Sequence, residues 1–534
     1  MTETTVPSPD VVLVQTDPEG AWHPAGRSGA DVKLIPAGKG LRVEVAATGP
    51  LSRVSLRWRR NSAPATVVLG DAWERSYGEL EWRSARAERA LPWMVLAYVA
   101  DSGRAAGFGV EVRGGAFAFW QLDAAGVSLM LDLRSGGAAV HPGNRTVHAA
   151  TVRWTSAQTT AFAAQCELAA TLCRDPLLPD QPVVGANNWY YAYGKDFDAA
   201  AVVRDARTIA ELAGDHPVRP FGVVDDGWSP EGTADGRAAS GGPWDTGRGV
   251  TFPSMPDVAA AIRAEGVRPG IWFRPLLRRD NWTDGARGPR DGGIALDPTS
   301  NAVLDAVGED VRRFTEWGFE LIKHDFSTYD LLGCWGPAMG AAPTRGPALA
   351  DPTVTTAEAL VAFYTRIRES AGDAIVLGCN VVGHLAAGLV HAQRVGDDTS
   401  GVDWNRTRRV GVNTLAFRLA QHGRFFAVDP DCVPSTPHTD WSLNRQFLDL
   451  VARSGAVLFV SVDPKTRTDA VDADLAAALR LALDGGSAGD VEPVDWLTSP
   501  TPRTWRFGRE TVTYDWMGSA GADPFEPGTS ATVP

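Results

Sequence analysis

Short apolar segments alternate with helical segments eight times between about residues 182 and 485. This alternation is typical of a (β/α)8 barrel, although a doubly wound open sheet would look similar. No G-x-G-x-x-G motif follows the first strand, so a dinucleotide-binding fold gains no support. The expected strands are Val183–Gly185, Pro220–Val224, Pro269–Phe273, Leu321–Lys323, Ile375–Leu377, Gln393–Val395, Phe425–Val428 and Val457–Val460, and the expected helices include Ala199–Leu212, Met255–Glu265, Asn301–Trp317, Thr355–Ala371 and Leu475–Leu483.

The sequence on either side of this region has the pattern of β-strands. Residues 1–178 contain short alternating runs separated by Gly, Pro and Asp, which predicts a β-sandwich. After the Pro-rich segment Asp175–Pro179, we expect the barrel over 179–486 and a small C-terminal β-domain with a disordered tail over 487–534. The fold class is thus multidomain α/β with a central TIM barrel. The expected elements outside the barrel include strands Val11–Val14, Leu41–Val45, Val54–Trp58, Val110–Arg113, Val127–Leu133 and Val147–Trp154, a helix Phe162–Cys173, and a hairpin joining Thr504–Phe507 to Thr511–Trp516.

Charge and hydropathy limit the partners. Asp and Glu number 64 against 51 Lys and Arg, for a net charge of −13, whereas nucleic-acid-binding proteins normally carry a basic surface. No run of about 18 apolar residues is present, so no membrane span is expected. Met1–Asp10 has neither a basic nor an apolar region, so no signal peptide is expected. The five cysteines are odd in number and widely spaced, which favours reduced thiols and a cytoplasmic location.

The expected C-terminal ends of the strands are rich in carboxylates, amides and tryptophan. In a parallel barrel these ends meet at one mouth, where the chemistry takes place. A pair of carboxyl groups is what glycoside hydrolysis requires, although single aspartates at such junctions also cap helices. The set comprises Asn187–Tyr190, Asp225–Trp228, Trp272, Arg274, Lys323, Asp325, Cys379, Asn380, Arg394, Asp397, Asp398, Asp429 and Asp431.

Two of these groups, Asp225–Asp226 and Asp429–Asp431, have the oxygen ligands that a hard cation prefers. No H-E-x-x-H, H-x-H or EF-hand spacing accompanies them, and no G-x-S-x-G motif indicates a serine nucleophile. We therefore expect no metal and no other cofactor.

The segment Leu321–Phe326 ends the fourth expected strand. Lys323 and Asp325 are two residues apart, so on a strand they point to the same side, and His324 points to the other. A cation beside a carboxylate keeps it ionised, as a nucleophile requires. A buried salt bridge that closes the strand is an equally good interpretation of these residues alone.

Taken together, the motifs resemble the α-galactosidase clan of retaining glycoside hydrolases, families 27 and 36, and the domain order is closer to family 36. The resemblance covers about 182–485 and rests on motifs after five strands. These are Asn188–Tyr190, Asp225–Trp228, Lys323–Asp325, Arg394–Asp398 and Asp429–Cys432.

The resemblance implies a role for each matching residue. Asp325 matches the nucleophile and Asp398 the general acid/base, with Asp397 as the neighbouring candidate. An acid needs a raised pKa, which we expect from the like charge of Asp397 or from partial burial. The implied substrate-binding residues are Trp189, Asp225, Asp226, Trp272, Lys323, Cys379, Asn380 and Arg394.

The implied function is a retaining exo-glycosidase that hydrolyses terminal α-linked galactose or a related sugar from a small carbohydrate. The ends of strands 3 and 5, Phe273–Pro275 and Gly378–Gly383, depart from the family pattern, so the sugar stays open. A transglycosylase of the same family and a non-catalytic carbohydrate-binding homologue are the alternatives. A homo-oligomer is possible, although the chain is smaller than typical tetrameric members.

Overall fold

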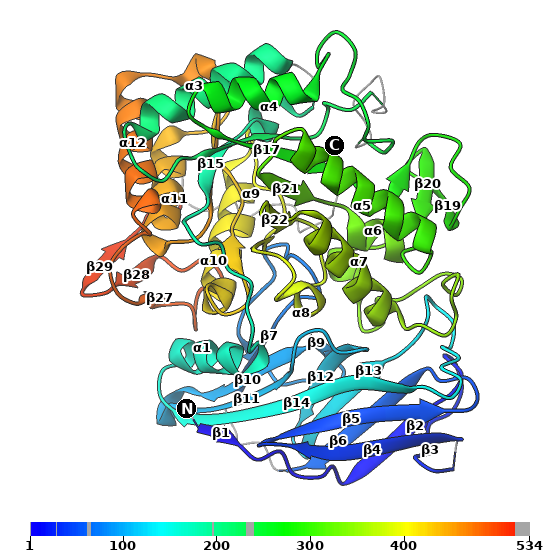
Figure 1. Ribbon diagram of the computed structural model, residues 1–534. Coiled ribbons are helices and arrows are strands. Elements are labelled where there is room, and N and C mark those ends of the chain that lie inside the picture. Colours follow the sequence, from blue (N-terminus) through cyan, green and yellow to red (C-terminus); the bar gives the residue numbers. More distant parts are fainter. Residues whose placement is uncertain (1, 28, 61–65, 195–196, 231–239, 518–534) are drawn as a thin grey trace.

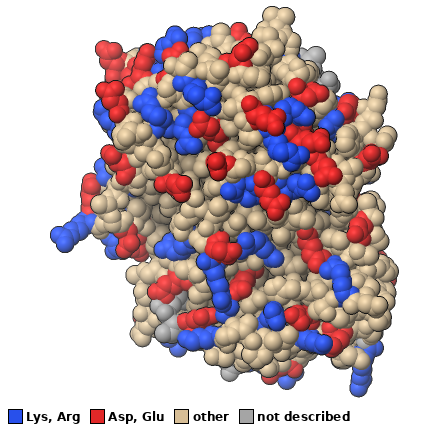
Figure 2. Space-filling model, viewed as in Figure 1, with Lys and Arg blue, Asp and Glu red and all other residues tan. Residues whose placement is uncertain are grey.

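The computed structural model describes residues 2–27, 29–60, 66–194, 197–230 and 240–517. A β-sandwich lies at the bottom of Figure 1 and a barrel of strands and helices lies above it. The predicted tail, Ala520–Pro534, lies outside the described residues. Basic and acidic side chains are interspersed over the face shown in Figure 2.

The barrel contains all eight predicted strands, and their pairing is parallel throughout. The seventh strand position is split into two pieces, β24 and β25. β24 pairs with β23, whereas β25 pairs with β26, and Val457 N–H donates to Val428 O at 2.9 Å. This closes the barrel and excludes the open sheet. The strands are β15 (Val184–Asn187), β16 (Phe221–Val224), β17 (Arg268–Phe273), β21 (Leu321–His324), β22 (Ile375–Gly378), β23 (Ala392–Arg394), β24 (Ala427–Asp429), β25 (Val433–Ser435) and β26 (Leu458–Val462).

Amphipathic helices cover the barrel. In α5, Val303, Val307, Val311 and Phe314 recur at helical spacing and are buried, as expected for a helix with one face on a core. Helix α7 begins with a capping box in which Thr355 and Glu358 satisfy each other's backbone N–H. The main helices are α3 (Ala199–Ala213), α4 (Met255–Ala264), α5 (Asn301–Glu316), α7 (Thr356–Ser370), α11 (Trp441–Ser454) and α12 (Asp469–Leu483).

Shorter elements lie in the loops of the barrel. A three-stranded sheet of β18 (Leu277–Arg278), β19 (Ala286–Arg290) and β20 (Gly293–Leu296) follows β17. The short helices are α2 (Trp189–Ala192), α6 (Ser327–Leu332), α8 (Gly383–Ala386), α9 (Trp404–Thr407) and α10 (Asn413–Arg418), with a π-helical turn at Arg408–Val412 and 3-10 turns at Gly336–Met339, Leu419–Gln421 and Pro464–Thr466. A further 3-10 turn, Ala100–Ser102, lies in the N-terminal domain.

Two antiparallel sheets form the N-terminal sandwich, as predicted. Across the two sheets, Trp58 packs against Trp154 and Trp120 packs against Phe108, with ring centroids 5.3 and 5.9 Å apart. Aromatic pairs of this kind stabilise a core by about 0.5–1.5 kcal/mol each beyond area burial. One sheet contains β1 (Thr2–Thr4), β4 (Ala30–Ala37), β5 (Gly40–Ala47), β7 (Val67–Gly70), β8 (Arg83–Ser84), β10 (Met94–Val99), β11 (Arg104–Val110) and β14 (Thr146–Gln158), and the other contains β2 (Val11–Gln15), β3 (His23–Pro24), β6 (Arg53–Arg59), β9 (Leu91–Pro92), β12 (Phe117–Asp123) and β13 (Gly126–Asp132).

The predicted strand Val110–Arg113 is wrong beyond its first residue. β11 ends at Val110, and Arg113 adopts a left-handed conformation with φ 64°. The Arg113 N–H donates to His384 O of the barrel at 2.8 Å. A contact with the barrel therefore replaces the strand pairing that the pattern suggested.

The remaining predicted elements are present. Helix α1 (Ala161–Leu172) follows β14, and the C-terminal hairpin is β28 (Thr504–Phe507) and β29 (Glu510–Thr513), joined by β27 (Val491–Pro493). We propose 1–178, 179–486 and 487–534 as domain limits, because each of the five sheets among the described residues draws its strands from one of these ranges. Within the described part of the chain, no helix is long and apolar enough to cross a membrane.

One segment of the sandwich leaves its sheet and reaches the barrel. Between β7 and β8, the stretch 71–80, which we call the insert segment, forms a bridge from Ser76 to Gly396 beyond β23. Trp73 Nε1–H donates to Gly340 O at 2.8 Å, and Asp71 pairs with Arg418 of the barrel at 2.7 Å. The sandwich therefore contributes residues to the C-terminal mouth of the barrel.

Candidate active site

Asp225 and Asp226 follow β16 and are buried. Lys323 Nζ donates to Asp225 Oδ2 at 2.7 Å, and Asn187 Nδ2 donates to the same oxygen. Burial lowers the pKa of Lys323, but the Asp225 carboxylate outweighs this and raises that pKa above its ordinary value. The direct partner of Lys323 is thus Asp225, where Asp325 was expected.

Asp226 differs from its neighbour in its partners. The backbone N–H of Ser240 donates to both carboxyl oxygens of Asp226 at 3.2 Å. Burial raises the pKa of Asp226 to about 6, because desolvation penalises the charged form. The two carboxyls form a polar floor between β15 and β21 at the mouth.

Asp325 stands at the end of β21 and is 8% exposed. Trp272 Nε1–H donates to its Oδ2 at 3.3 Å, and the backbone N–H of Phe326 donates to Oδ1 at 2.7 Å. Phe326 has φ 60°, a strained conformation for a bulky residue. The Arg274 guanidinium stacks 4.3 Å from the Phe326 ring, so packing holds the turn that presents Asp325.

His324 lies on the opposite side of β21. Its ring packs against Phe363 and Tyr364 of α7, with centroids 6.3 and 6.0 Å away. Burial lowers its pKa to about 4, so the imidazole is neutral near pH 7. The His324 side chain therefore packs between β21 and α7, on the side of the strand away from Asp325, as its strand position predicted.

Asp398 and Asp397 follow β23 and share a set of arginines. Asp398 Oδ1 lies 2.9 Å from Arg394 Nη2 and 3.1 Å from Arg75 Nη1. Asp397 lies 3.4 Å from Arg75 Nη2 and 2.6 Å from Arg406 Nη2. The Asp398 side chain is 37% exposed and that of Asp397 13%. Asp398 is thus the more open of the two carboxylates.

The predicted rise in the pKa of Asp398 is wrong. Burial by itself raises the pKa of this carboxyl group. The nearby cations Arg75, Arg394, Arg406 and Lys323 outweigh burial and lower the pKa of Asp398 to about 2. Asp397 shows the opposite direction, because burial raises its pKa. The like charge of Asp397 is visible in the sequence, whereas the approach of Arg75 is not.

Arg394 is almost fully buried and has three protein partners. Besides Asp398, its Nη1 contacts Asp431 Oδ1 at 2.6 Å, and its Nη2 donates to Tyr190 Oη at 3.1 Å. Tyr190 in turn donates to Asp431. Arg394 therefore joins the ends of the first, sixth and seventh strands.

The end of β22 places Cys379 and Asn380 in the same cluster. Burial raises the pKa of the Cys379 thiol well above its ordinary value, and the Asp325 charge adds to this. Asn380 is fully buried; its Nδ2 donates to Glu74 and its Oδ1 accepts from Tyr329 N at 3.3 Å. Both ends of the Asn380 amide thus bind protein groups, including a carboxylate from the sandwich.

Trp189 and Trp272 also lie at the mouth. Trp272 packs edge-on against Trp244 at 5.9 Å and Phe326 at 6.5 Å. Trp189 is half-buried, and its N–H donates to Asn187 Oδ1 at 2.8 Å. The structure therefore brings all ten predicted site residues to the ends of the first six strands.

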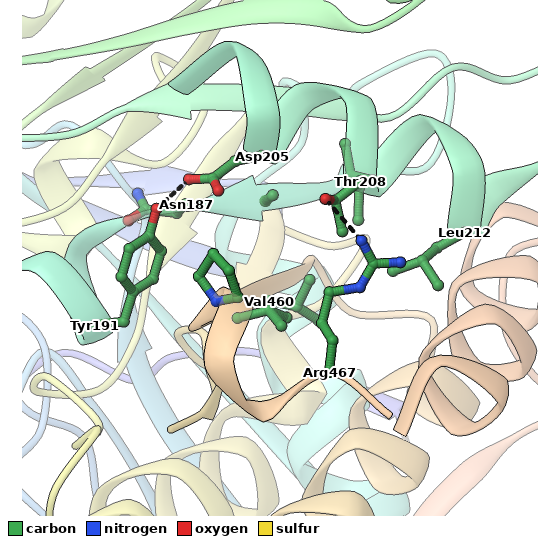
Figure 3. Close-up of a pocket in the computed structure, with 11 residues that line it drawn as sticks. Asn187, Tyr191, Asp205, Thr208, Leu212, Val460 and Arg467 are labelled. Carbon is green, nitrogen blue, oxygen red and sulfur yellow. Dashed lines mark hydrogen bonds between the residues drawn. The ribbon is translucent and has the colours of Figure 1, made fainter. Parts of the chain in front are cut away.

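A small cavity lies behind this cluster, between α3, β15 and β26 (Figure 3). Its volume is about 20 Å³, room for about one water molecule. Tyr191 donates to Asp205 there, and Arg467 donates to Thr208 Oγ1 at 3.1 Å. The cavity is too small for a sugar and belongs to the packing of α3 on the barrel.

Sequence reasoning missed the insert segment. Glu74 and Arg75 are buried and contact Asn380, Asp397 and Asp398. The available signal is the loss of alternation between Val67–Gly70 and Leu91–Pro92, where charged and aromatic residues accumulate. Among the described residues, no group of three or more His, Cys, Asp and Glu side chains could hold a metal ion.

No protein-family model matches the sequence. The α-galactosidase TtGalA from Thermus thermophilus, solved with p-nitrophenyl α-D-galactopyranoside, aligns over 96% of this chain and 99% of its own, at 20% identity and a TM-score of 0.60. A variant of the GH36 α-galactosidase AgaA from Geobacillus stearothermophilus, solved with raffinose, aligns over 85% of this chain and 67% of its own, at 14% identity and a TM-score of 0.60. The galactosidase domain of AgaSK, an α-galactosidase–sucrose kinase, aligns over 90% of this chain and 76% of its own, at 14% identity and a TM-score of 0.58. The protein therefore has the fold of the family 36 α-galactosidases.

Proposed function

We propose that the protein is a retaining exo-glycosidase that hydrolyses a terminal α-linked galactose or a related sugar. The observation that carries this proposal is the placement of Asp325 and Asp398 at the ends of the fourth and sixth strands. Both face one cluster around the buried Cys379. The charges of Asp325 and Arg394 both act on the pKa of the Cys379 thiol, and Arg394 binds Asp398 at 2.9 Å. Two carboxyl groups across one site are what glycoside hydrolysis requires.

In the first step, the Asp325 carboxylate attacks the anomeric carbon and the bond to the leaving oxygen breaks. Asp398 gives its proton to that oxygen, and a glycosyl ester on Asp325 results. The Trp272 N–H and the Phe326 N–H hold Asp325 in place for this attack. A sugar that covers the half-open Asp398 desolvates its carboxylate, and desolvation raises a carboxyl pKa.

In the second step, Asp398 accepts a proton from water as the water oxygen attacks the anomeric carbon. The ester bond to Asp325 breaks, and the sugar leaves with its original configuration. Here the low pKa of Asp398 is appropriate, because a base must start ionised. Asp397, whose pKa is raised by burial, is the alternative acid/base.

The Asp225–Lys323 pair and Asp226 support a sugar with several hydroxyl groups, because they supply ionised acceptors and a donor on one floor. Solved structures of the same fold carry p-nitrophenyl α-galactoside and raffinose, so these two compounds are the first substrates to test. All five cysteines are free thiols, which supports a reducing compartment, and we propose the cytoplasm.

The test is a panel of nitrophenyl glycosides: α-galactoside, N-acetylgalactosaminide, arabinopyranoside and glucoside. We expect turnover of the α-galactoside or a close relative, and NMR of the first product should show the α-anomer. Asp325→Ala should abolish turnover with an unchanged circular dichroism spectrum, whereas Asp305→Ala, an exposed position on α5, should keep it. Transfer to an added sugar in place of water would favour the transglycosylase, and binding without turnover the non-catalytic homologue.

A further inference from the structure

The insert segment places one arginine between the two carboxylates that follow β23. Arg75 Nη1 lies 3.1 Å from Asp398 Oδ1, and Arg75 Nη2 lies 3.4 Å from Asp397 Oδ1. The bridge between Ser76 and Gly396 fixes this approach, with Ser76 N–H donating to Val395 O at 2.9 Å and Asp397 N–H donating to Ser76 O at 2.7 Å. The backbone of the sandwich is thus paired to the loop that carries both candidates for the acid/base.

Aromatic rings on the insert segment and on the barrel pack against the Arg75 side chain. Its guanidinium stacks 5.7 Å from the Trp335 ring and 5.7 Å from the Tyr77 ring. Tyr77 Oη donates to Glu74 at 2.8 Å, and Glu74 also accepts from Gly336 N at 2.7 Å. Arg75 is 6% exposed, so its guanidinium is kept in place beside Asp397 and Asp398 with little contact with solvent.

We propose that Arg75 is a positioning residue that the N-terminal domain supplies to the barrel, where it orients Asp398 and keeps it ionised for the step in which it acts as a base. This inference rests on the proposed function, because it assigns a role within that reaction. Arg75 touches no reacting atom and acts through Asp398.

Other charges also face Asp398, and the role of Arg75 must be separated from theirs. Removing Arg75 leaves three cations in place, so the expected change is a shift in the titration of Asp398 and not its loss. The groups are Lys323 on β21, Arg394 on β23, Asp397 and Arg406 in the loop and helix after β23, Asp431 after β24, and Tyr190 and Tyr193 in and after α2.

The sign of the shift follows from the charge. Arg75 favours the ionised form of Asp398, so its removal lets Asp398 keep a proton to higher pH. In the first step the protonated form gives its proton to the leaving oxygen, and in the second the ionised form takes one from water. Without Arg75, the alkaline limb of kcat on an unactivated substrate, which reports Asp398 in the enzyme–substrate complex, should therefore move to higher pH.

The experiment measures kcat for raffinose at saturating substrate against pH in the wild type and in Arg75→Gln, Arg75→Lys and Arg145→Gln. Arg145 is the matched control, because it also joins the sandwich to the barrel, through Glu358 at 2.6 Å, but contacts α7 and not the mouth. We expect Arg75→Gln to move the alkaline limb upward by about one pH unit or more. Arg75→Lys should restore most of the wild-type limb, and Arg145→Gln should leave it unchanged.

A uniform loss of activity at every pH in a folded Arg75→Gln variant would overturn the proposal, since a purely structural role predicts that result. If the wild type turns over no glycoside, the proposed function fails, and Arg75 is then tested by carboxyl ¹³C NMR. Asp398→Asn identifies the Asp398 resonance, and its titration should move upward in Arg75→Gln. Equal titration in the two proteins would overturn the assignment to Arg75.

Discussion

At the scale of single residues, the two carboxylates of the proposed mechanism lie in different surroundings. Asp325 is nearly buried and receives two N–H donors, whereas Asp398 is 37% exposed and lies among cations. Enzymes obtain a nucleophile and an acid/base from the same residue type by this kind of difference in environment. The greater exposure of Asp398, and its contact with the buried Arg394 that joins three strand ends, are our grounds for preferring it over Asp397.

Asp398→Ala should slow the hydrolysis of raffinose by about 10²–10⁴-fold, because the sugar oxygen leaves poorly without a proton. The loss on p-nitrophenyl α-galactoside should be much smaller in the first step, since nitrophenolate leaves unaided. Burst and steady-state kinetics on both substrates measure this. If Asp397→Ala shows the substrate-dependent loss and Asp398→Ala does not, Asp397 is the acid/base.

At the scale of elements, the insert segment is stabilised by a buried carboxyl. Glu74 is fully buried, accepts from Asn380, Gly336 and Tyr77, and has a pKa raised by burial to about 7. A raised pKa means that the folded state binds the proton more tightly than the unfolded state. The associated stability is complete below the unfolded pKa near 4.5 and is lost as the pH rises towards 7.

We therefore expect the free energy of unfolding of the wild type to fall between about pH 4.5 and pH 7, by a few kcal/mol at most. The thermal midpoint should fall over the same pH range. Glu74→Gln removes the titrating group and should flatten that part of the profile, while losing stability at low pH because its amide N–H₂ opposes the Asn380 donor. Differential scanning calorimetry across this range measures both effects. An unchanged slope in Glu74→Gln would contradict the assignment of this component to Glu74.

At the scale of the whole molecule, a buried ion pair joins the sandwich to the barrel. Asp71 accepts from Arg418 at 2.7 Å, from Gln421 at 2.9 Å and from Trp93 at 2.8 Å, and both charged side chains are nearly inaccessible. Removing one partner leaves a buried charge without compensation, which typically costs 3–5 kcal/mol. The two domains are therefore expected to depend on each other for stability.

Asp71→Ala should lower the free energy of unfolding by about 3–5 kcal/mol. The matched control is Asp123→Ala, whose partner Arg57 lies 2.9 Å away in a partly exposed pair within the sandwich, and pairs at the surface contribute about 0–1 kcal/mol. Urea unfolding followed by fluorescence and circular dichroism compares the two. Equal losses in both variants would show that burial of the Asp71 pair is not the cause.

Much of the fold could be predicted from local patterns. Apolar runs such as Ile375–Leu377 and the periodic face of α5 are set by short-range burial, and parallel connectivity brings every strand end to one mouth. The ten predicted site residues lie there because each is in the last two residues of its own strand or follows that strand closely in sequence. The split seventh strand and the end of β11 at Val110 depended on long-range pairing and were not predictable.

The sequence by itself determined which carboxylates reach the mouth, since a residue one to four positions beyond a parallel strand has little freedom to be elsewhere. Tertiary structure alone decided their protonation. Arg75 and Asp398 are 323 residues apart in the chain, and nothing in the local pattern of either indicates the other. A pKa depends on every charge within a few ångströms. The direction in which the pKa of Asp398 shifts therefore depends on the packing of the sandwich against the barrel.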